Sequence, residues 1–304
     1  MSTNEVIQTP MDLPEISTSK PKKSLALDNS QWRILPNNCF APVGRTTPNI
    51  TPGSYFAYFD DNYGPTLKKI NIVMDDIVKL SDSTSDYVLR TIQTFWSKKK
   101  KFEDMGQVFK RGVLLYGPPG SGKTVTIGML SKDVINQGGI VVFVSSPHTA
   151  SQCLAIVREV QPDIPVVCVY EDVDEIIQQY GEHDVLALLD GEKQISNVVN
   201  VLTTNYPSKL AARIINRPSR VDEVIKIDYP NAKIRREYLS YLGVGKLNIT
   251  TWVQKTKNLT LAHLRELVIA VHCLGRSFEE TVDRLQKMSK KIKDEEELNG
   301  GVGF

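Results

Sequence analysis

The pattern of apolar and polar residues changes near residue 112 of the chain. From there to about residue 229, short apolar runs rich in Val and Ile alternate with helical patterns. Apolar runs of about four to eight residues are typical of strands buried on both faces, as in a parallel sheet covered by helices. The predicted strands are 112–116, 139–144, 164–170, 198–202 and 224–227, and the predicted helices are 124–136, 149–160 and 173–189. The pattern therefore predicts an α/β fold with a doubly wound parallel sheet.

The segments on either side of this region have other patterns. The N-terminus is rich in Ser, Thr, Lys and Pro, and an aromatic-rich stretch with strand character follows it. A helix is expected over 81–101, and after Pro230 the pattern is helical throughout. The predicted parts are a disordered arm (1–30), a short β-containing N-terminal section (31–74), the α/β core (75–229), a small C-terminal helical domain (230–293) and a flexible tail (294–304).

Composition excludes several classes of protein. The chain has 304 residues, enough for about two domains, with 41% hydrophobic and 24% charged residues. A net charge of +2 gives no support for a surface that binds nucleic acid over the whole chain. Four dispersed cysteines do not suit a disulfide scaffold, and no apolar run reaches the roughly 18 residues of a membrane span. We therefore expect a cytoplasmic protein with no membrane partner.

A glycine-rich turn follows the first strand of the core. Residues 117–124 fit the pattern G-x-x-x-x-G-K-[ST] between a strand and a helix. Glycines let backbone N–H groups converge on phosphate oxygens, and the helix N-terminus adds a favourable dipole. Lys123 is expected to reach the β- and γ-phosphates, and Thr124 to hold Mg²⁺. The predicted phosphate-binding residues are Gly117, Pro118, Pro119, Gly120, Ser121, Gly122, Lys123 and Thr124.

Two acidic residues follow the buried strand 164–170. A strand that ends in two carboxylates, downstream of a phosphate loop, suits a Mg²⁺-linked acid beside an acid that polarises water. By register, Glu171 takes the metal role and Asp172 the catalytic role. The usual order of the two acids is reversed, so the shorter Asp172 needs a backbone shift to reach the water. The alternative is that both residues only favour the start of the next helix.

Polar residues also follow the strand 198–202. If this strand lies between the other two, Thr204 and Asn205 are expected beside the γ-phosphate, where Asn205 would orient the attacking water. The alternative is that these are ordinary polar residues where a strand passes into a loop.

Further along, Arg217 and Arg220 flank a proline and suit arginine fingers that stabilise the charge of a transferred phosphate. Solvated arginines are the alternative there.

Together these residues resemble the AAA+ ATPases, in their AAA clade, over about residues 75–274. The loop at 117–124 looks like Walker A, and the strand that ends at Asp172 looks like Walker B with its acids inverted. Asn205 matches the sensor-1 position. Arg217 and Arg220 match paired arginine fingers, which act in the site of a neighbouring subunit. The inverted acids are similar to those of the mitochondrial Rieske-protein translocase branch and of small phage-encoded ATPases.

The resemblance also implies a base-binding segment and a lid. Asp76 and Ile77 resemble the residues that line the adenine pocket, and residues 230–293 correspond to a small helical lid. His263 stands where other clades carry a sensor-2 arginine, with Arg265 as an outside candidate. The cofactors implied are ATP and Mg²⁺, and the assembly implied is a homo-oligomeric ring, usually a hexamer.

These features predict an ATP hydrolase that remodels a macromolecule. The leading hypothesis is a protein remodeller, and the others are a DNA-linked motor or loader and a slowly hydrolysing assembly scaffold. The segment 145–152 should face the central pore, but it lacks the aromatic triplet of protein-threading relatives. The lysines at 98–101 suit a solvated helix end or a nucleic-acid contact, so nucleic acid is possible but not indicated. The aromatic residues at 55–63 are expected to recognise a specific partner or to pack as core; if phage-encoded, the protein would act in the host cytoplasm.

Overall fold

A computed structural model describes residues 31–35, 39–43, 46–71, 78, 80, 84–190, 196–215 and 217–299. The chain divides into two compact units, one up to Ile50 and one from Thr51 onward. In the first unit, β1 (Gln31–Leu35) and β2 (Cys39–Val43) form an antiparallel hairpin. The predicted arm at 1–30 lies outside the described residues.

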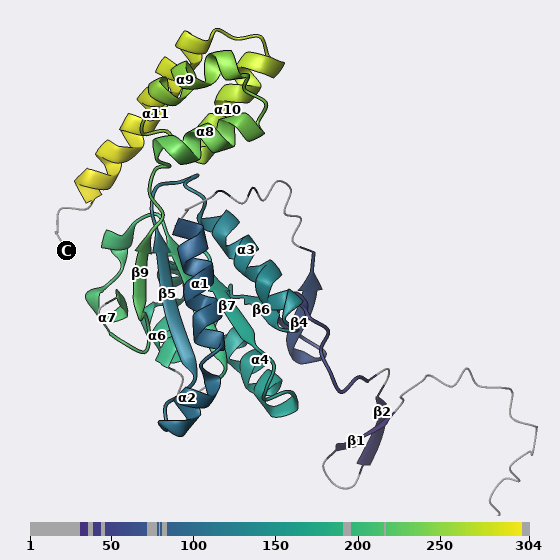
Figure 1. Ribbon diagram of the computed structural model, residues 1–304. Coiled ribbons are helices and arrows are strands. Elements are labelled where there is room, and N and C mark those ends of the chain that lie inside the picture. The colour runs from purple at the N-terminus through teal and green to yellow at the C-terminus, as the bar shows by residue number, and fades with distance from the viewer. Residues whose placement is uncertain are drawn as a thin grey trace, which may run out of the picture. The chain divides into compact units, whose positions relative to one another are not determined.

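The second unit is built on a seven-stranded sheet with the order β4-β3-β6-β7-β8-β5-β9 (Figure 1). Only β3 and β4 pair antiparallel, and every other neighbouring pair is parallel. The strands are β3 (Gly53–Asp60), β4 (Gly64–Ile70), β5 (Lys110–Tyr116), β6 (Ile140–Phe143), β7 (Val166–Tyr170), β8 (Val198–Thr204) and β9 (Glu223–Lys226). The prediction of an α/β fold with a doubly wound, mostly parallel sheet is confirmed.

The β3–β4 hairpin differs from the expectation of a separate N-terminal section. It extends the core sheet, because β3 pairs with β6 in parallel. Tyr55 and Ala57 are buried on this hairpin, and the hydroxyl of Tyr55 donates to the carbonyl of Thr51 at 2.5 Å. Phe59 is 58% exposed. Of the aromatic residues weighed as core or recognition surface, Tyr55 is therefore core, and Phe59 stays on the surface.

Helices cover both sides of the sheet (Figure 1). They are α1 (Thr84–Trp96), α2 (Lys99–Asp104), α3 (Lys123–Asn136), α4 (Pro147–Val160), α5 (Val173–Tyr180), α6 (Glu182–Asp190) and α7 (Ala212–Ile215). α1 packs against α3, whereas α4 and α5 pack against α6. The single helix predicted over 173–189 is in fact two, because Gly181 has φ of 86° and breaks it.

The C-terminal helices have a hydrophobic core of their own. They are α8 (Ala232–Tyr241), α9 (Lys246–Lys255), α10 (Leu261–Val268) and α11 (Phe278–Asn299), with a π-helical turn at Ile269–Cys273. Leu239, Trp252 and Leu264 are buried in this core. The helix α11 includes residues 294–299, which were expected in the flexible tail, and residues 300–304 are not described. Within the described part of the chain, no helix is long and apolar enough to span a membrane.

Candidate active site

The predicted phosphate loop joins β5 to α3 at the carboxyl edge of the sheet. Gly117, Gly120 and Gly122 have φ of 151°, 74° and 113°, values that L residues with side chains rarely adopt. The loop therefore turns its backbone inward only because these positions are glycine. Lys123 is 8% exposed, and its Nζ donates to the carbonyl oxygens of Gly117 at 2.7 Å and Pro118 at 3.2 Å. The ammonium group of Lys123 therefore lies inside the loop that is expected to bind phosphates.

The hydroxyl of Ser121 indicates whether a phosphate ligand fits this site. The Oγ of Ser121 is buried in the loop and has no hydrogen-bond partner among the described residues. An unpaired buried hydroxyl normally costs free energy, so its position indicates an acceptor supplied by a ligand. The glycine backbone, the Lys123 cation and this hydroxyl together fit a phosphate chain.

The two acids after β7 have different partners. The hydroxyl of Thr124 hydrogen-bonds to the carboxylate of Glu171, whereas Asn205 Nδ2 donates to Asp172 Oδ1 at 3.4 Å. Asn205 Oδ1 accepts from Lys123 Nζ at 2.6 Å, so the amide bridges the cation and the acid. A hydroxyl beside a carboxylate suits Mg²⁺, which prefers oxygen ligands. The geometry thus brings Glu171 beside Thr124, a pair of oxygen groups that could hold Mg²⁺, and Asp172 beside Asn205.

Asp172 has an uncommon backbone conformation. Its φ of 46° and ψ of 58° are left-handed, which Asp tolerates better than most residues that carry a side chain. It stands directly before α5, and its N–H donates to the Oγ1 of Thr203 at 3.0 Å. The strand-to-helix turn therefore departs from ordinary geometry at the residue whose shorter side chain was expected to need a backbone shift.

Burial raises the pKa of Glu171, and the nearby charge of Asp172 raises it further, against the lowering effect of the hydrogen bond from Thr124. The carboxylate is therefore costly to keep charged in the absence of a cation. A divalent metal between Glu171 and Thr124 would offset this cost and favour the charged form.

In the nucleotide-free protein, Glu171→Gln is expected to raise Tm at pH 7 by about 1–3 °C, because a charge is no longer buried beside Asp172. The folded pKa of Glu171 lies above the unfolded value. The cost is thus fully present above the folded pKa and disappears below about pH 4.3, so the gain should shrink toward acid pH. Thermal unfolding without Mg²⁺ at pH 7 and 4.5 measures this. Glu175→Gln, an exposed acid of α5, is the control, and a gain that grows toward acid pH would contradict the prediction.

A cavity of about 410 Å³ surrounds these groups. Its lining residues are Val78, Leu80, Pro119, Gly120, Gly122, Lys123, Thr124, Val125, Glu171, Asp172, Thr203, Asn205, Tyr238, Leu261, Ala262 and Arg265. The C-terminal helices thus contribute one wall, and the N–H of Ala262 donates to the carbonyl of Gly120 at 3.3 Å. Asp76 and Ile77, predicted to line the adenine pocket, lie outside the described residues.

Two predictions are corrected by side-chain direction. Thr204 does not line the cavity: its hydroxyl donates to Asp174 Oδ1 at 2.7 Å, and Thr203 lines the cavity instead. Alternation along β8 puts Thr203 and Asn205 on the same side, a signal present in the sequence.

The second correction concerns α10. The side chain of His263 contacts the start of this helix, where its Nδ1 lies 2.6 Å from the Oγ1 of Thr260. Arg265 is the cation of α10 that lines the cavity.

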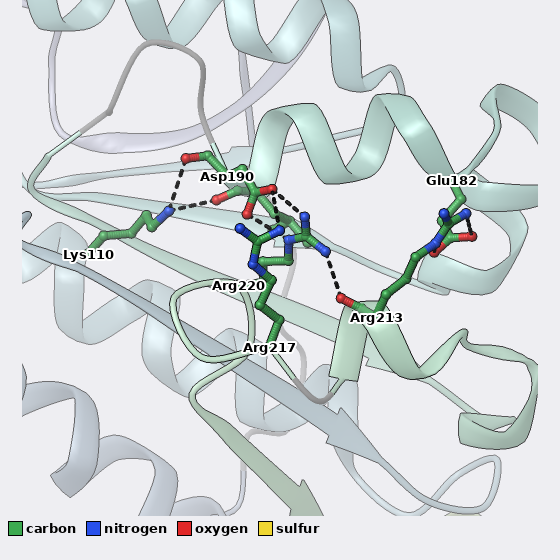
Figure 2. Close-up of polar contacts among 7 residues, drawn as sticks. Lys110, Glu182, Asp190, Arg213, Arg217 and Arg220 are labelled. Carbon is green, nitrogen blue, oxygen red and sulfur yellow. Dashed lines mark hydrogen bonds and ion pairs between the residues drawn. The ribbon is translucent and has the colours of Figure 1, made fainter.

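The two predicted arginine fingers have different environments (Figure 2). The side chain of Arg217 is 60% exposed. The side chain of Arg220 is 7% exposed, and its Nε donates to Asp190 Oδ1 at 2.6 Å. The expectation that both arginines act in a neighbouring site is therefore corrected for Arg220, which is bound inside its own subunit. Only Arg217 of the two is available at the surface.

The expected pore segment is mostly helical. α4 begins at Pro147 with Ser146 as its N-cap, so His148 lies in the first turn of the helix and not in a loop. Its Nε2 lies 3.2 Å from Gln152 Nε2 on the next turn.

Among the described residues, no group of three or more His, Cys, Asp or Glu is arranged to hold a metal ion.

Residues 113–229, which contain the loop, both acids and both arginines, match the model of the ATPase family associated with various cellular activities (AAA). This region of the chain is thus similar to the AAA ATPases. The predicted resemblance to this family is confirmed over these residues, and the match supports the prediction of an ATP hydrolase.

Similar proteins include ATP-dependent zinc metalloprotease FtsH 1 of Conexibacter woesei, 28% identical over 59% of this chain and 31% of the relative. FtsH 1 of Thermomicrobium roseum is 25% identical over 77% of this chain and 41% of its own length. The mitochondrial inner membrane i-AAA protease supercomplex subunit YME1 of Saccharomyces cerevisiae is 26% identical over 57% and 25%, respectively. The match thus spans less than half of each relative.

Proposed function

We propose that this protein is an AAA+ ATPase that assembles into a homo-oligomeric ring of six subunits, as the resemblance implies, and that it uses ATP hydrolysis with Mg²⁺ to remodel a protein partner. The observation that carries this proposal is the position of Arg217. Its side chain is exposed, and Arg217 is not among the residues that line the cavity of its own subunit. An arginine that stabilises transferred phosphate charge is commonly supplied in trans.

Within one subunit, the groups of the cavity divide the work. Lys123 and Arg265 bind the phosphates, while Thr124 and Glu171 hold Mg²⁺. The bound metal supplies charge that neutralises the phosphate oxygens. Asp172 polarises the attacking water, and Asn205 orients it through the hydrogen bond that joins the two side chains.

Mixing Arg217→Ala subunits with Asp172→Asn subunits is expected to restore hydrolysis that neither variant has alone. A mixed interface joins the intact acids of the first variant to the intact arginine of the second. Steady-state phosphate release across mixing ratios measures this, with Arg276→Ala, an exposed arginine between α10 and α11, as the matched control. If the dilute monomer hydrolysed ATP as fast per subunit as the concentrated protein, and mixing restored no activity, the proposed ring assembly would be contradicted.

Protein is the favoured substrate class for two reasons. The relatives described above are named as proteases, and the net charge of the chain, only +2, is too small to favour nucleic acid. The first turn of α4 carries His148 in place of an aromatic grip, which favours a specific folded partner over threading of unfolded chains. The proposed location is the cytoplasm, and the likeness to small phage-encoded ATPases stays a prediction.

The stimulation of turnover separates protein remodelling from its alternatives. Cell extract is added to the ATPase untreated, after protease treatment and after nuclease treatment, and duplex DNA is added in a fourth reaction. Loss of stimulation after protease treatment alone supports a protein partner. Stimulation by DNA that weakens with salt supports a DNA-linked motor. Slow turnover unchanged by every addition supports a nucleotide-dependent scaffold.

A further inference from the structure

A second cavity, of about 750 Å³, lies where the chain passes from β9 into α8. The α/β core and the C-terminal helices both line it: Lys226 is the last residue of β9, Arg235 is on α8 and Lys257 follows α9. The volume lies in the range of pockets that hold small organic ligands. Lys123 and Glu171 line the first cavity and not this one, so this β9–α8 cavity is distinct from the proposed ATP site.

The charged side chains that line the β9–α8 cavity are mostly cations. Lys226, Arg235 and Lys257 are basic, and Asp228 is the acid that accompanies them among the described lining residues. Lys226 Nζ lies 2.9 Å from Asp228 Oδ2, so this pair is balanced. Within the described part of the chain, neither Arg235 nor Lys257 forms an ion pair. The lining residues therefore leave a surplus of two positive charges.

Arg235 is a buried cation in the wall of this cavity. Its residue is 7% exposed, Nη1 donates to the carbonyl of Pro230 at 2.8 Å, and Nη2 donates to the carbonyl of Val253 at 3.0 Å. Its Nε is buried and has no hydrogen-bond partner among the described residues. Burial lowers the pKa of Arg235, because the charged form loses its hydration. A buried cation without a counter-charge costs free energy, and an anion in the cavity would offset that cost.

The start of α8 also lines the β9–α8 cavity, through Asn231 and Ala232. The side chain of Asn231 accepts from the N–H of Ile234 at 3.0 Å and so caps the helix. The other N–H groups of a first helical turn have no partner within the helix, and the helix dipole favours negative charge there. Helix start and unbalanced cations thus favour the same kind of ligand.

We propose that the β9–α8 cavity binds a small anion that carries a phosphate group, at a site separate from the ATP site. The surplus of two cations matches the charge of a phosphate monoester, about −1.5 to −2 at pH 7. Lys226 contacts the anion from the core and Lys257 from the C-terminal helices, while the charge of Arg235 strengthens the attraction. The rest of the volume has room for the organic part of the ligand.

The test is calorimetric titration of the full-length protein with glycerol 2-phosphate, with saturating ADP and Mg²⁺ present to keep the phosphate loop occupied. We expect one saturable site with a Kd below about 1 mM. Lys257→Ala should weaken this binding by about 10-fold, because a charge-assisted contact is lost. The matched control is Lys255→Ala, which removes an exposed lysine of α9 that does not line the cavity and should leave the Kd unchanged.

Asp228→Asn tests the sign of the charge at this site. The amide keeps the size of the side chain, but Lys226 loses the carboxylate that balances it. Binding of glycerol 2-phosphate should therefore tighten by about 3-fold, whereas damage to the fold would weaken it. Arg235 is left in place, because its guanidinium holds two backbone carbonyls and its removal would test the fold instead.

Absence of saturable binding to the wild-type protein would overturn the proposal. Binding that neither Lys257→Ala nor Asp228→Asn changes would place the anion elsewhere and would also overturn it. Equal affinity for succinate, a dicarboxylate, would show that the cavity attracts anions in general, so the assignment to phosphate would be wrong. Thermal unfolding without ligand verifies that both variants are folded.

Discussion

Lys123→Ala is expected to weaken ATP binding by at least about 100-fold, because the phosphate chain loses a cation whose charge-assisted hydrogen bonds contribute roughly 1.5–3 kcal/mol each. Lys123 already lies within the loop, where its Nζ donates to the carbonyls of Gly117 and Pro118 and to Asn205. ATP has only to replace these acceptors with phosphate oxygens. Calorimetric titration with ATP and Mg²⁺ measures the effect.

The control for this variant is Lys100→Ala, which removes an exposed lysine of α2 and should leave ATP binding unchanged. Thermal unfolding without nucleotide shows whether Lys123→Ala is folded. A folded Lys123→Ala protein that binds ATP with wild-type affinity would contradict the assignment of this loop as the phosphate site.

Asp172→Asn is expected to retain ATP binding and to reduce hydrolysis by about 10²–10³-fold. The amide keeps the shape of the side chain and removes the charge that polarises the attacking water. Glu171→Gln should differ, because it weakens the pairing with Thr124 that suits Mg²⁺, so a higher Mg²⁺ concentration should recover part of its activity. Single-turnover hydrolysis at several Mg²⁺ concentrations separates the two acids.

Asp184→Asn, a half-exposed acid of α6, is the matched control and should hydrolyse ATP at the wild-type rate. The roles of the two acids would be reversed if Asp172→Asn hydrolysed normally while Glu171→Gln did not. The left-handed backbone at Asp172 would then need another explanation.

The sequence by itself determined the features that depend on neighbouring residues. The apolar runs located β5 to β8 because a strand buried on both faces needs continuous apolar side chains, and a shorter run located the edge strand β9. The loop 117–124 was predictable because phosphate binding requires glycine, lysine and a hydroxyl at set spacing. Glu171, Asp172 and Asn205 could be placed near this loop, since the carboxyl ends of parallel strands meet at one edge of the sheet.

Only the tertiary structure decided which distant groups meet. The pairing of β3 with β6 joins segments far apart in the chain, and the local pattern of β3 is the same for a core edge strand and for a separate hairpin. Asp190 and Arg220 are 30 residues apart, and no spacing rule connects them. The motif predicts two equivalent arginines, but packing buries one and exposes the other. Their different environments follow from long-range contacts, which the order of residues alone does not express.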